Sequence, residues 1–384
     1  MAKKKILIIN KSFVLGGIQT SLINMLNVIK NDYDVTLAIF NPHGPLKIKL
    51  PEGVKLLKLS PFVQVLGMSV TDCKSYGNLF HRVFKFLVSV WSKLFNNTFP
   101  VAFALAFQKN VGDYDIVVSY HHETSKKSTV TGFGEFALKK CSAPVKIAWI
   151  HADFIATKLA TAKNLRTYEK FDKIISVSKT CMESFKAVYP SLKEKCDYCY
   201  NYVPADEVVE KGNAESNVFD KSDESLVLFS AGRLRNEKGF IPALENLLPL
   251  WEKGLDFKWY IAGDGVLKEP LLQWIKEHSL EDKVFLLGFK SNPYPYIKEA
   301  DYLFLPSLHE TFSMVVGEAH ALGTSVIASD IPIMREVLGK TDFLCENGDF
   351  AKCIAKLERK TEISVREQSA SDWAKEFERV IGNE

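Results

Sequence analysis

One stretch of this sequence, residues 302–336, constrains the fold more than any other. It contains an apolar run, a polar turn, a helical repeat of apolar residues that ends at a glycine, and a second apolar run. The predicted elements are a strand at Tyr302–Leu305, a helix from about Phe312 to Leu322 and a strand at Ser325–Ala328. Strand, helix and strand in so few residues predict a βαβ unit, whose helix begins at the carboxyl edge of a parallel sheet, where such folds bind ligands. Two glutamates, Glu310 and Glu318, are therefore expected at a ligand-binding edge.

The remainder of the chain shows the same α/β alternation, in two halves. At 384 residues the chain exceeds what one core usually supports, so two domains are expected. We predict an N-terminal domain over 1–205 and a C-terminal domain over 206–370, each a Rossmann-like parallel sheet. A polar stretch over 210–225 has the composition of a linker. A final helix within 371–384 is separated from the second sheet and is expected to pack back on the first domain.

Charge is distributed unevenly along the chain. The formal net charge is +3, but residues 1–205 carry 28 Lys and Arg against 14 Asp and Glu, a net of +14. The remainder carries 21 basic and 32 acidic residues, a net of −11. The field of a basic half attracts anionic surfaces, so nucleic acid and anionic lipid are both candidate partners. The sequence has no helix-turn-helix, zinc or aromatic RNA-binding pattern, so we expect no nucleic-acid partner.

Residues 79–107 form the most apolar region of the sequence. Arg82, Lys85 and Lys93 interrupt this region, so no run approaches the roughly 20 residues that a membrane-spanning helix needs. An aromatic, leucine-rich helix that carries basic residues can lie on an anionic membrane surface. It can equally be a core helix whose lysines extend to solvent. The sequence leaves both interpretations open.

Cysteine usage and the N-terminus favour a reducing compartment. The seven cysteines are odd in number and have no repeated spacing, which argues against a disulfide framework. Cys196 and Cys199 form a lone CxxC without a second pair or nearby histidines, so chance spacing is favoured over a metal or redox site. The opening MAKKKILIINKS predicts a first strand rather than a signal peptide, because its apolar run is short. We expect a cytoplasmic protein, peripheral at the inner face of the plasma membrane if residues 79–107 bind lipid.

Three groups of residues in the first domain have positions typical of a site. Gly16 and Gly17 precede a helix, where paired glycines let a phosphate or another backbone approach, although a plain tight turn explains them as well. His122 follows one apolar run, and His151 and Asp153 follow the next. Polar groups just beyond parallel strands are where such sheets place working residues. A lone histidine is otherwise more often structural.

Residues of the second domain have the chemistry to hold a diphosphate. Arg233 and Lys238 follow its first predicted strand, and a guanidinium fork and a compact ammonium both bind phosphate oxygens. A diphosphate leaving group gathers negative charge, which fixed cations and helix-start amides can stabilise without a metal. The amides expected at the helix start are those of Thr311, Phe312 and Ser313. Taken alone, GRLRNEKG is more often a solvated basic loop, but its place after a strand favours the site.

Further candidates lie at the same predicted edge. Two turns follow the next strands: Gly263 to Gly265, and Gly288 followed by Phe289 and Lys290. Glu310 precedes the helix of the βαβ unit, and Glu318 lies about two turns inside it, where a carboxylate can accept hydrogen bonds from a ribose diol. The simpler explanation of the two glutamates is a cap residue and a solvated helix residue.

Several motifs together resemble a known family. In this order and spacing, GRLRNEKG, IAGDG, LGF, NPYPYIKEADYLFLPSLHETFSMVVGEAHALG and SDIPIMREV resemble the donor-binding half of the retaining nucleotide-sugar glycosyltransferases of family 4, which have the GT-B fold. The resemblance is specific over about residues 226–340. It is thinner over the first domain, where it rests on GGIQTSLINML, two histidines and NYVPADEV. It implies two Rossmann-like domains facing each other across a cleft, and a retaining hexosyl transfer that needs no metal or other cofactor.

The resemblance also implies roles for individual residues. By motif match, the donor would be held by Arg233 and Lys238 at its diphosphate, Glu318 at its ribose, Glu310 at a sugar hydroxyl and the backbone near Phe289 and Lys290 at its base. Gly16 and Gly17 would bring the first domain's loop against the diphosphate as the cleft closes. His122 would orient the sugar or the acceptor hydroxyl, with His151 and Asp153 as second candidates.

The predicted function is transfer of a sugar, most commonly from a UDP-sugar in this family, to a glycan or lipid-linked acceptor in the synthesis of a cell-surface polysaccharide such as a capsule. Two positions depart from the family pattern: Thr311 stands where glycine is common, which narrows the space beside the sugar, and Gln19 replaces an acid. The alternatives are a nucleotide-sugar epimerase or hydrolase on the same fold, and a non-catalytic partner of another transferase. The intact cations and glutamates argue against a non-catalytic partner.

Overall fold

The computed structural model describes residues 2–219, 225–357 and 369–382. The chain forms two compact units. Unit 1 consists of Met1–Tyr202 and Ala370–Glu384, and unit 2 consists of Val203–Ser369. The division after residue 202 lies three residues before the predicted boundary after residue 205.

Within the described residues, unit 1 is built on a seven-stranded sheet whose neighbouring strands are all parallel. In spatial order the strands are β3 (Lys55–Leu57), β2 (Tyr33–Asn41), β1 (Lys4–Ser12), β5 (Ile116–Ser119), β7 (Val145–Ile150), β8 (Lys173–Ser176) and β9 (Cys196–Tyr198). A separate pair is formed by β4 (Val111–Asp113) and β6 (Cys141–Ser142). The strands are apolar runs because a parallel sheet is buried on both faces. Their order reverses between β1 and β5, which makes the carboxyl ends of these strands a topological switch point.

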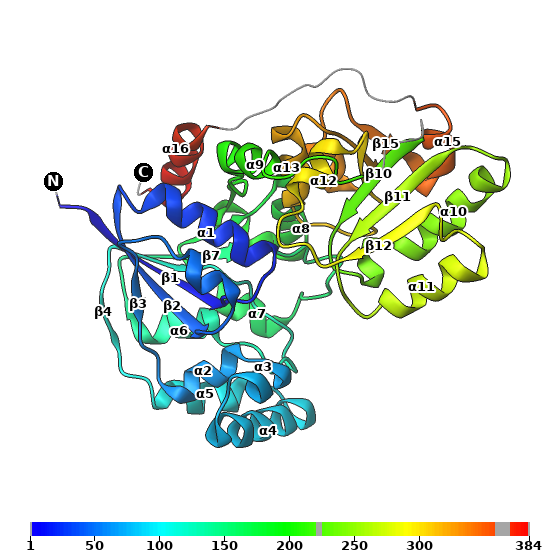
Figure 1. The fold of residues 1–384 in the computed structure, drawn as a ribbon. Coiled ribbons are helices and arrows are strands. Elements are labelled where there is room, and N and C mark those ends of the chain that lie inside the picture. Colours follow the sequence, from blue (N-terminus) through cyan, green and yellow to red (C-terminus); the bar gives the residue numbers. More distant parts are fainter. Residues whose placement is uncertain (1, 220–224, 358–368, 383–384) are drawn as a thin grey trace. The chain divides into compact units, whose positions relative to one another are not determined.

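Helices cover the sheet of unit 1. They include α1 (Gly17–Ile29), α6 (Phe133–Lys140), α7 (Ala162–Tyr168), α8 (Lys179–Val188) and α16 (Ala370–Ile381). Although α16 comes from the far end of the chain, it lies beside α1 (Figure 1). Its buried Trp373 and Phe377 pack on the sheet, and the Phe377 ring centroid lies 6.0 Å from that of Trp149 on β7. The final helix therefore belongs to unit 1. Residues 383 and 384, the end of its predicted range, lie outside the described residues.

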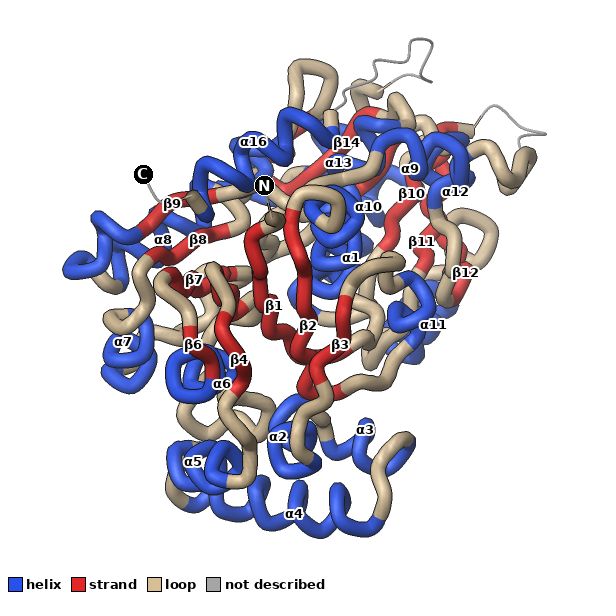
Figure 2. The backbone as a smooth tube through the Cα atoms, turned by 90° about the vertical axis from the view of Figure 1, so that its left-hand side faces the viewer, coloured by secondary structure: helices blue, strands red, loops and turns tan. Residues whose placement is uncertain are grey.

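Four more helices of unit 1 lie together beyond the carboxyl ends of β1 and β2 (Figure 2). They are α2 (Pro61–Gly67), α3 (Val70–Ser75), α4 (Leu79–Leu94) and α5 (Thr98–Ala106). The packing on the strand ends is close, because a Cβ added at Gly67 would lie 2.3 Å from the Cβ of Phe40 and 2.8 Å from the backbone nitrogen of Asn41. The apolar region 79–107 thus forms two helices. Among the described residues, no helix combines the length and the apolar character needed to cross a bilayer.

Unit 2 has a six-stranded sheet in its described residues, again with parallel neighbours. In spatial order the strands are β12 (Val284–Gly288), β11 (Phe257–Ala262), β10 (Leu226–Ala231), β13 (Tyr302–Leu305), β14 (Ser325–Ser329) and β15 (Phe343–Cys345). The helices are α9 (Ala205–Gly212), α10 (Phe240–Glu252), α11 (Lys268–Glu277), α12 (Tyr294–Glu299), α13 (Met314–Ala321), α14 (Pro332–Val337) and α15 (Phe350–Ile354). The predicted βαβ unit is present as β13, α13 and β14, with Tyr302 opposite Ser325 in parallel register.

The prediction of a linker over 210–225 is wrong for its described part. Residues 210–212 end the helix α9, and Val208 of that helix and the later Phe219 are buried in a core of unit 2. The polar composition was misleading because α9 is amphipathic: it exposes a charged face and buries a narrow apolar stripe. Residues 220–224 lie outside the described residues.

Candidate functional site

The order of the strands in unit 2 reverses between β10 and β13. Arg233 and Lys238 lie in the segment after β10, and Glu310 lies in the segment after β13. All three residues therefore lie at the switch point, the edge where open parallel sheets bind ligands. Arg233 is exposed and forms no ion pair with the described residues. The structure brings Lys238 and Glu310 into contact.

Lys238 and Glu310 form an ion pair between Nζ and Oε1. The Oγ of Ser307 donates a second hydrogen bond to the same carboxylate oxygen, at 3.0 Å. The side chains are 20% and 12% exposed, so the pair is shielded from water yet reachable from one side. Partial burial makes the interaction stronger than that of a surface ion pair and fixes both side chains in one geometry. A cation and a carboxylate are thus held side by side at the edge of the sheet.

A glycine next to Lys238 permits this contact. Gly239 has φ +67°, in the left-handed region, and a Cβ added there would lie 2.0 Å from the carbonyl oxygen of Pro306. The backbone after β10 can therefore cross directly over the end of β13 only with glycine at this position. The Leu308 amide also donates to the Glu237 carbonyl at 2.9 Å, which ties the two loops together.

The predicted glycine turn after β11 serves loop packing as well. A Cβ added at Gly263 would lie 1.8 Å from the Gly232 carbonyl oxygen, and one added at Gly265 would lie 2.4 Å from the Leu234 carbonyl oxygen. The Gly263 amide donates to the Gly288 carbonyl at 2.8 Å. These close approaches join the loops that follow β10, β11 and β12 into one layer at the carboxyl edge.

The start of α13 differs from the prediction. The helix begins at Met314 rather than near Phe312, because Ser313 adopts a left-handed conformation with φ 64° and turns the chain into the helix. The amides of Thr311 and Phe312 are consequently not at the helix start, and the outward-pointing amides begin at Met314. The Ser313 hydroxyl is buried and has no hydrogen-bond partner among the described residues. Glu318 lies about one turn inside the helix, not two.

Glu318 has an unusual environment for a carboxylate. Its side chain is half-buried, and the hydroxyl of Tyr294 on α12 donates to its Oε1 at 3.3 Å. Burial raises the pKa of Glu318 to about 7, although the hydrogen bond from Tyr294 and the charge of Lys211 oppose this shift. Glu318 is therefore partly protonated at neutral pH. Sequence reasoning missed Tyr294, for which the NPYPY motif gave no chemical signal.

Phe289 and Lys290, the predicted neighbours of the base, follow β12 at the same edge. Phe289 is exposed, and the Lys290 ammonium lies 5.1 Å from the ring centroid of Tyr296, within the range of a cation–π interaction. Their backbone is thus presented on the same edge as the Lys238 and Glu310 pair.

In unit 1, three histidines gather beyond β5 and β7. The rings of His121 and His122 are stacked with centroids 4.8 Å apart, and the ring of His151 lies 4.6 Å from that of Tyr120. Burial lowers the pKa of His121 to about 4 and that of His151 to about 3, and it lowers the pKa of His122 well below its usual value. All three are neutral imidazoles at pH 7. His121 was missed by sequence reasoning, although it stands next to His122 in the HH pair.

Two ring nitrogens in this cluster, the Nδ1 of His122 and the Nε2 of His151, are buried and have no hydrogen-bond partner among the described residues. In contrast, His121 is engaged, because its Nδ1 lies 3.1 Å from the carbonyl oxygen of His122. A neutral imidazole can donate to or accept from a hydroxyl, so His122 and His151 have the chemistry to orient one.

Asp153, the other predicted acceptor residue, is occupied by a local turn. Its Oδ1 accepts hydrogen bonds from the Ser184 hydroxyl at 2.5 Å and from the Ile155 and Ala156 amides at 2.9 and 3.1 Å. These contacts give Asp153 a structural role in shaping the segment after β7.

The paired glycines after β1 differ in their packing. Gly16 is the residue before α1 and has extended backbone, and a Cβ added there would lie 2.9 Å from the Oε1 of Gln19, the end of a flexible side chain. A Cβ added at Gly17 would meet nothing within 4 Å. The contact of this loop with a phosphate stays a prediction.

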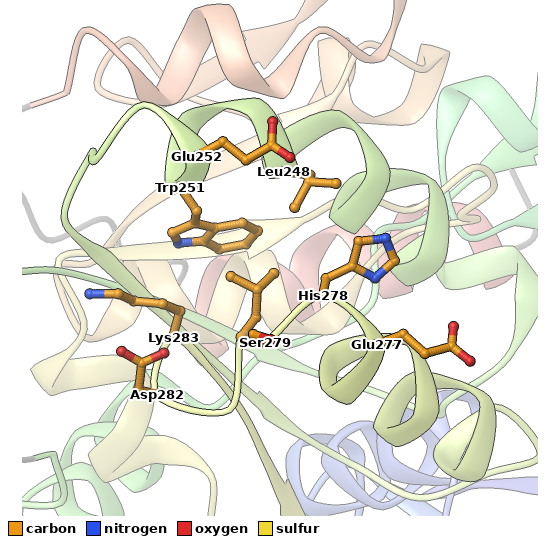
Figure 3. A pocket seen from close by; sticks show the side chains of 9 residues that line it. Leu248, Trp251, Glu252, Glu277, His278, Ser279, Asp282 and Lys283 are labelled. Atoms are coloured by element: carbon orange, nitrogen blue, oxygen red, sulfur yellow. The ribbon is translucent and has the colours of Figure 1, made fainter.

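A cavity of about 440 Å³ lies at the opposite, amino edge of the sheet of unit 2 (Figure 3). It lies between the carboxyl ends of α10 and α11, where Trp251 and His278 face it. Its charged residues are of both signs, and Lys283 pairs with Asp256 at 2.9 Å. None of the predicted site residues lines this cavity.

The chain thus has two Rossmann-like units. One carries a cation and carboxylate pair at its strand ends, and the other carries neutral histidines. Residues 213–376 match the family model described as glycosyl transferases group 1. The chain is 33% identical over 177 residues to the N-acetylgalactosamine-N,N'-diacetylbacillosaminyl-diphospho-undecaprenol 4-alpha-N-acetylgalactosaminyltransferase of Campylobacter jejuni, a match that covers 46% of each chain. It is 24% identical over 360 residues to the UDP-Gal:alpha-D-GlcNAc-diphosphoundecaprenol alpha-1,3-galactosyltransferase of Escherichia coli, covering 92% of this chain and 86% of that one.

Solved structures share the fold. Anabaena HepE in complex with UDP and glucose matches with a TM-score of 0.61 and 17% identity, over 92% of this chain and 89% of that one. TarM matches with a TM-score of 0.61 and 15% identity, over 99% of this chain and 96% of that one. The fold is GT-B, as predicted. Residues 213–376 are similar to the group 1 glycosyltransferases, which confirms the resemblance, and the chain spans about half the length of the first curated relatives that it matches.

The pKa of Glu318 predicts a pH-dependent stability. The folded protein binds the Glu318 proton more tightly than the unfolded chain, whose carboxyl has a pKa near 4.5. The resulting contribution to folding is complete below this value and is lost as the pH rises through about 7. The variant Glu318→Gln cannot ionise, so we expect it to gain stability relative to the wild type between about pH 5 and about pH 8, by roughly 2 kcal/mol. Thermal or urea unfolding across this range measures the gain.

The exposed Glu281 gives the control for this prediction. Glu281→Gln should shift the stability by a similar small amount at every pH. Parallel stability curves for the wild type and Glu318→Gln would contradict the raised pKa of Glu318.

Proposed function

We propose that this protein is a glycosyltransferase that moves a sugar from a nucleotide sugar to a hydroxyl of a glycan or lipid-linked acceptor. The observation that carries the proposal is the contact between Lys238 and Glu310, which lies at the switch point of unit 2 and inside the segment that matches the group 1 family. The ammonium can hold a phosphate, and the carboxylate beside it can hold a sugar hydroxyl. These are adjoining parts of a nucleotide sugar.

The remaining residues of unit 2 fit the other parts of such a donor. Arg233 and Lys238 bind the diphosphate, together with amides at the start of α13. Glu318 accepts from the ribose, and the backbone near Phe289 and Lys290 meets the base. As the bond between sugar and phosphate breaks, negative charge develops on the diphosphate, and these fixed cations and amides stabilise it. Because the chain itself supplies that stabilisation, we propose a reaction that needs no metal ion or other cofactor.

We further propose that the transferred hexosyl group keeps its anomeric configuration. The bond from the anomeric carbon to the acceptor oxygen forms as the bond to the diphosphate breaks, and the acceptor proton passes to the departing diphosphate. Glu310 positions a sugar hydroxyl and does not act as the nucleophile, which is consistent with its bonds to Lys238 and Ser307. In unit 1, the partly exposed ring of His122 orients the acceptor hydroxyl, and His151 assists it.

The names of the relatives support a substrate class. The Campylobacter jejuni and Escherichia coli relatives act, by their names, on sugars carried by diphospho-undecaprenol, and the Escherichia coli protein uses UDP-galactose. HepE was solved with UDP bound. We propose a UDP-sugar donor and a polyprenyl-diphosphate-linked acceptor in the synthesis of a surface polysaccharide.

A lipid-linked acceptor implies a membrane, and α4 offers a surface for one. Its outward face is apolar: Phe86 is 66%, Leu87 is 56% and Leu94 is 69% exposed. An exposed apolar face of this kind marks an interaction site. Residues 73–112 include four exposed basic residues, Lys74, Arg82, Lys93 and Lys109, and no acidic residue, so the charge around the face suits an anionic bilayer. We propose that α4 and α5 hold the protein peripherally on the cytoplasmic face of the plasma membrane.

The donor site is tested first by the variants Lys238→Ala and Glu310→Gln. Loss of Lys238 removes a charge-assisted bond to the diphosphate, so UDP affinity measured by calorimetry should fall roughly ten- to a hundredfold. In Glu310→Gln, UDP should bind at least as tightly as to the wild type, because Lys238 has lost its carboxylate partner. Its rate of sugar transfer should fall on the order of a hundredfold.

The exposed Lys253, at the end of α10, supplies the control for charge alone. Lys253→Ala should leave UDP binding and transfer unchanged. Thermal shifts with a panel of UDP-sugars identify the donor beforehand, because a bound ligand raises the apparent stability. Unchanged UDP binding in Lys238→Ala, or an undiminished transfer rate in Glu310→Gln, would contradict the site assignment.

The stereochemical and metal proposals have a joint experiment. With an α-linked UDP-sugar and an acceptor, NMR of the product should show an α linkage, and saturating EDTA should leave the rate unchanged. A β-linked product contradicts retention, and a rate restored only by a divalent cation contradicts metal independence. Incubation with the donor alone distinguishes a glycosyltransferase from a nucleotide-sugar epimerase, since rapid formation of an epimer would favour the epimerase.

The membrane proposal is tested by sedimentation with vesicles. The wild type should pellet with phosphatidylglycerol-containing vesicles more than with pure phosphatidylcholine vesicles. Replacing Phe86 and Leu94 by asparagine should reduce pelleting in both cases, because it removes apolar area from the bound face. Val266→Asn, at an exposed apolar residue of unit 2, is the control. Equal pelleting with both vesicle types would remove the electrostatic part of the proposal.

A further inference from the structure

The inward face of α4 carries polar residues on both sides of the buried Val88. Lys85 is only 2% exposed, and its ammonium donates to the carbonyl oxygens of Thr129 at 2.5 Å and Val65 at 3.4 Å. The hydroxyls of Ser89 and Ser92, one and two turns further along the helix, are buried without a hydrogen-bond partner among the described residues. A soluble protein normally has the reverse arrangement, with the apolar stripe inward.

Apolar contacts hold α4 at Val88, which belongs to the core of unit 1, and along its edges. The ring of Phe84 lies 5.1 Å from that of Phe62 on α2, and the ring of Trp91 lies 4.8 Å from that of Phe99 on α5. Because its inner face is partly polar and its outer apolar face is exposed, α4 gains less from burial than a helix of this composition could. Its hold on the rest of unit 1 therefore depends strongly on a few directed polar bonds.

Asn97, at the corner between α4 and α5, makes most of the other directed bonds. It is completely buried, and its amide nitrogen Nδ2 donates to the carbonyls of Ser125 and Ser128 at 3.1 and 3.2 Å. Its backbone amide donates to the Lys126 carbonyl at 2.8 Å. Its Oδ1 accepts from Lys163 of α7 at 2.7 Å. One side chain thus ties the corner to a single loop and to a neighbouring helix.

The loop held in this way is the segment that follows β5. It begins with His121 and His122 and continues to Thr131, whose Oγ1 also receives a bond from Asn97 at 3.2 Å. The start of the loop is anchored inside unit 1, where the Oε1 of Glu123 accepts from the Gly134 amide at 2.9 Å. Beyond Glu123, four of the loop's carbonyls, those of residues 125, 126, 128 and 129, are bonded to Asn97 or Lys85. The loop of His122 and the α4–α5 corner therefore form one hydrogen-bonded body.

We propose that Lys85 and Asn97 are positioning residues that couple the outward face of α4 to the loop of His122, so that contact of this face with an anionic lipid surface fixes the loop. This inference rests on the lipid surface proposed above. A helix with an exposed apolar face and a polar inner face opens locally at low cost in free energy, and the loop bonded to it opens with it. Lipid that binds only the closed arrangement lowers the population of the open one by mass action.

The test is hydrogen–deuterium exchange of the full chain, with and without phosphatidylglycerol-containing vesicles. In the wild type, exchange of peptides that cover 121–131 should slow on vesicle binding, by about tenfold when lipid is at ten times its dissociation constant. In Asn97→Ala and in Lys85→Met, the vesicles should still protect α4, but the slowing over 121–131 should be lost. The neighbouring variant Asn96→Ala is the matched control, because within the described part of the chain the Asn96 side chain bonds only to the Thr98 amide of its own corner.

The outcomes separate clearly. Unchanged exchange over 121–131 in vesicle-bound wild type would overturn the coupling, as would the same slowing in Asn97→Ala or Lys85→Met. Failure of the wild type to bind the vesicles would also overturn it. Thermal unfolding without lipid shows whether a variant has kept its fold. Because the two variants lie at separate positions, the test still applies if one of them does not fold. No nucleotide or acceptor takes part, so a failed glycosyltransferase assignment leaves this result unaffected, and the reverse also holds.

Discussion

The two large sheets that the described residues form are parallel, and a parallel sheet must be covered on both faces. This constraint requires a crossover connection, most often a helix, between successive strands, and it sends every loop that follows a strand to the same edge. Where the strand order reverses, neighbouring loops diverge and leave room for side chains to meet. Lys238 and Glu310 meet at the reversal in unit 2, and the segments that carry Gly16 and His122 leave the strands on either side of the reversal in unit 1. The chemistry of the protein is therefore located by its connectivity before any particular side chain is considered.

The same constraint explains how much of the fold could be predicted. Strands that are buried on both faces appear as short continuous apolar runs, so β13 was predicted with its observed bounds and β14 lacked one residue. The start of α13 was not predictable in the same way. Its geometry depends on Ser313 in a left-handed conformation, which a glycine would have signalled and a serine does not. The polar stretch over 210–219 shows the opposite error, since composition alone does not reveal that a short helix buries one narrow stripe.

For α4, periodicity predicts an amphipathic helix but not which face is turned inward. The sequence left open whether Lys85 reaches solvent, and the structure shows its ammonium bonded to the carbonyl oxygen of Thr129, 44 residues later in the chain. Only the position of distant backbone carbonyls decides this. The candidate site shows a similar pattern: residue types indicated which groups can hold phosphate or hydroxyl, whereas the contact of Lys238 with Glu310 and that of the Tyr120 ring with the His151 ring depend on tertiary structure.

The ion pair between Lys238 and Glu310 bears on turnover as well as on binding. The Lys238 ammonium already has a carboxylate partner, so without nucleotide neither charge of the pair is buried and unpaired. When a phosphate approaches, the ammonium must give up part of its interaction with the carboxylate. The carboxylate can take the ammonium back when a nucleotide leaves. An internal competitor of this kind weakens the binding of the diphosphate product and shortens the time for which it stays bound. A site with an unpaired lysine would bind the diphosphate more tightly.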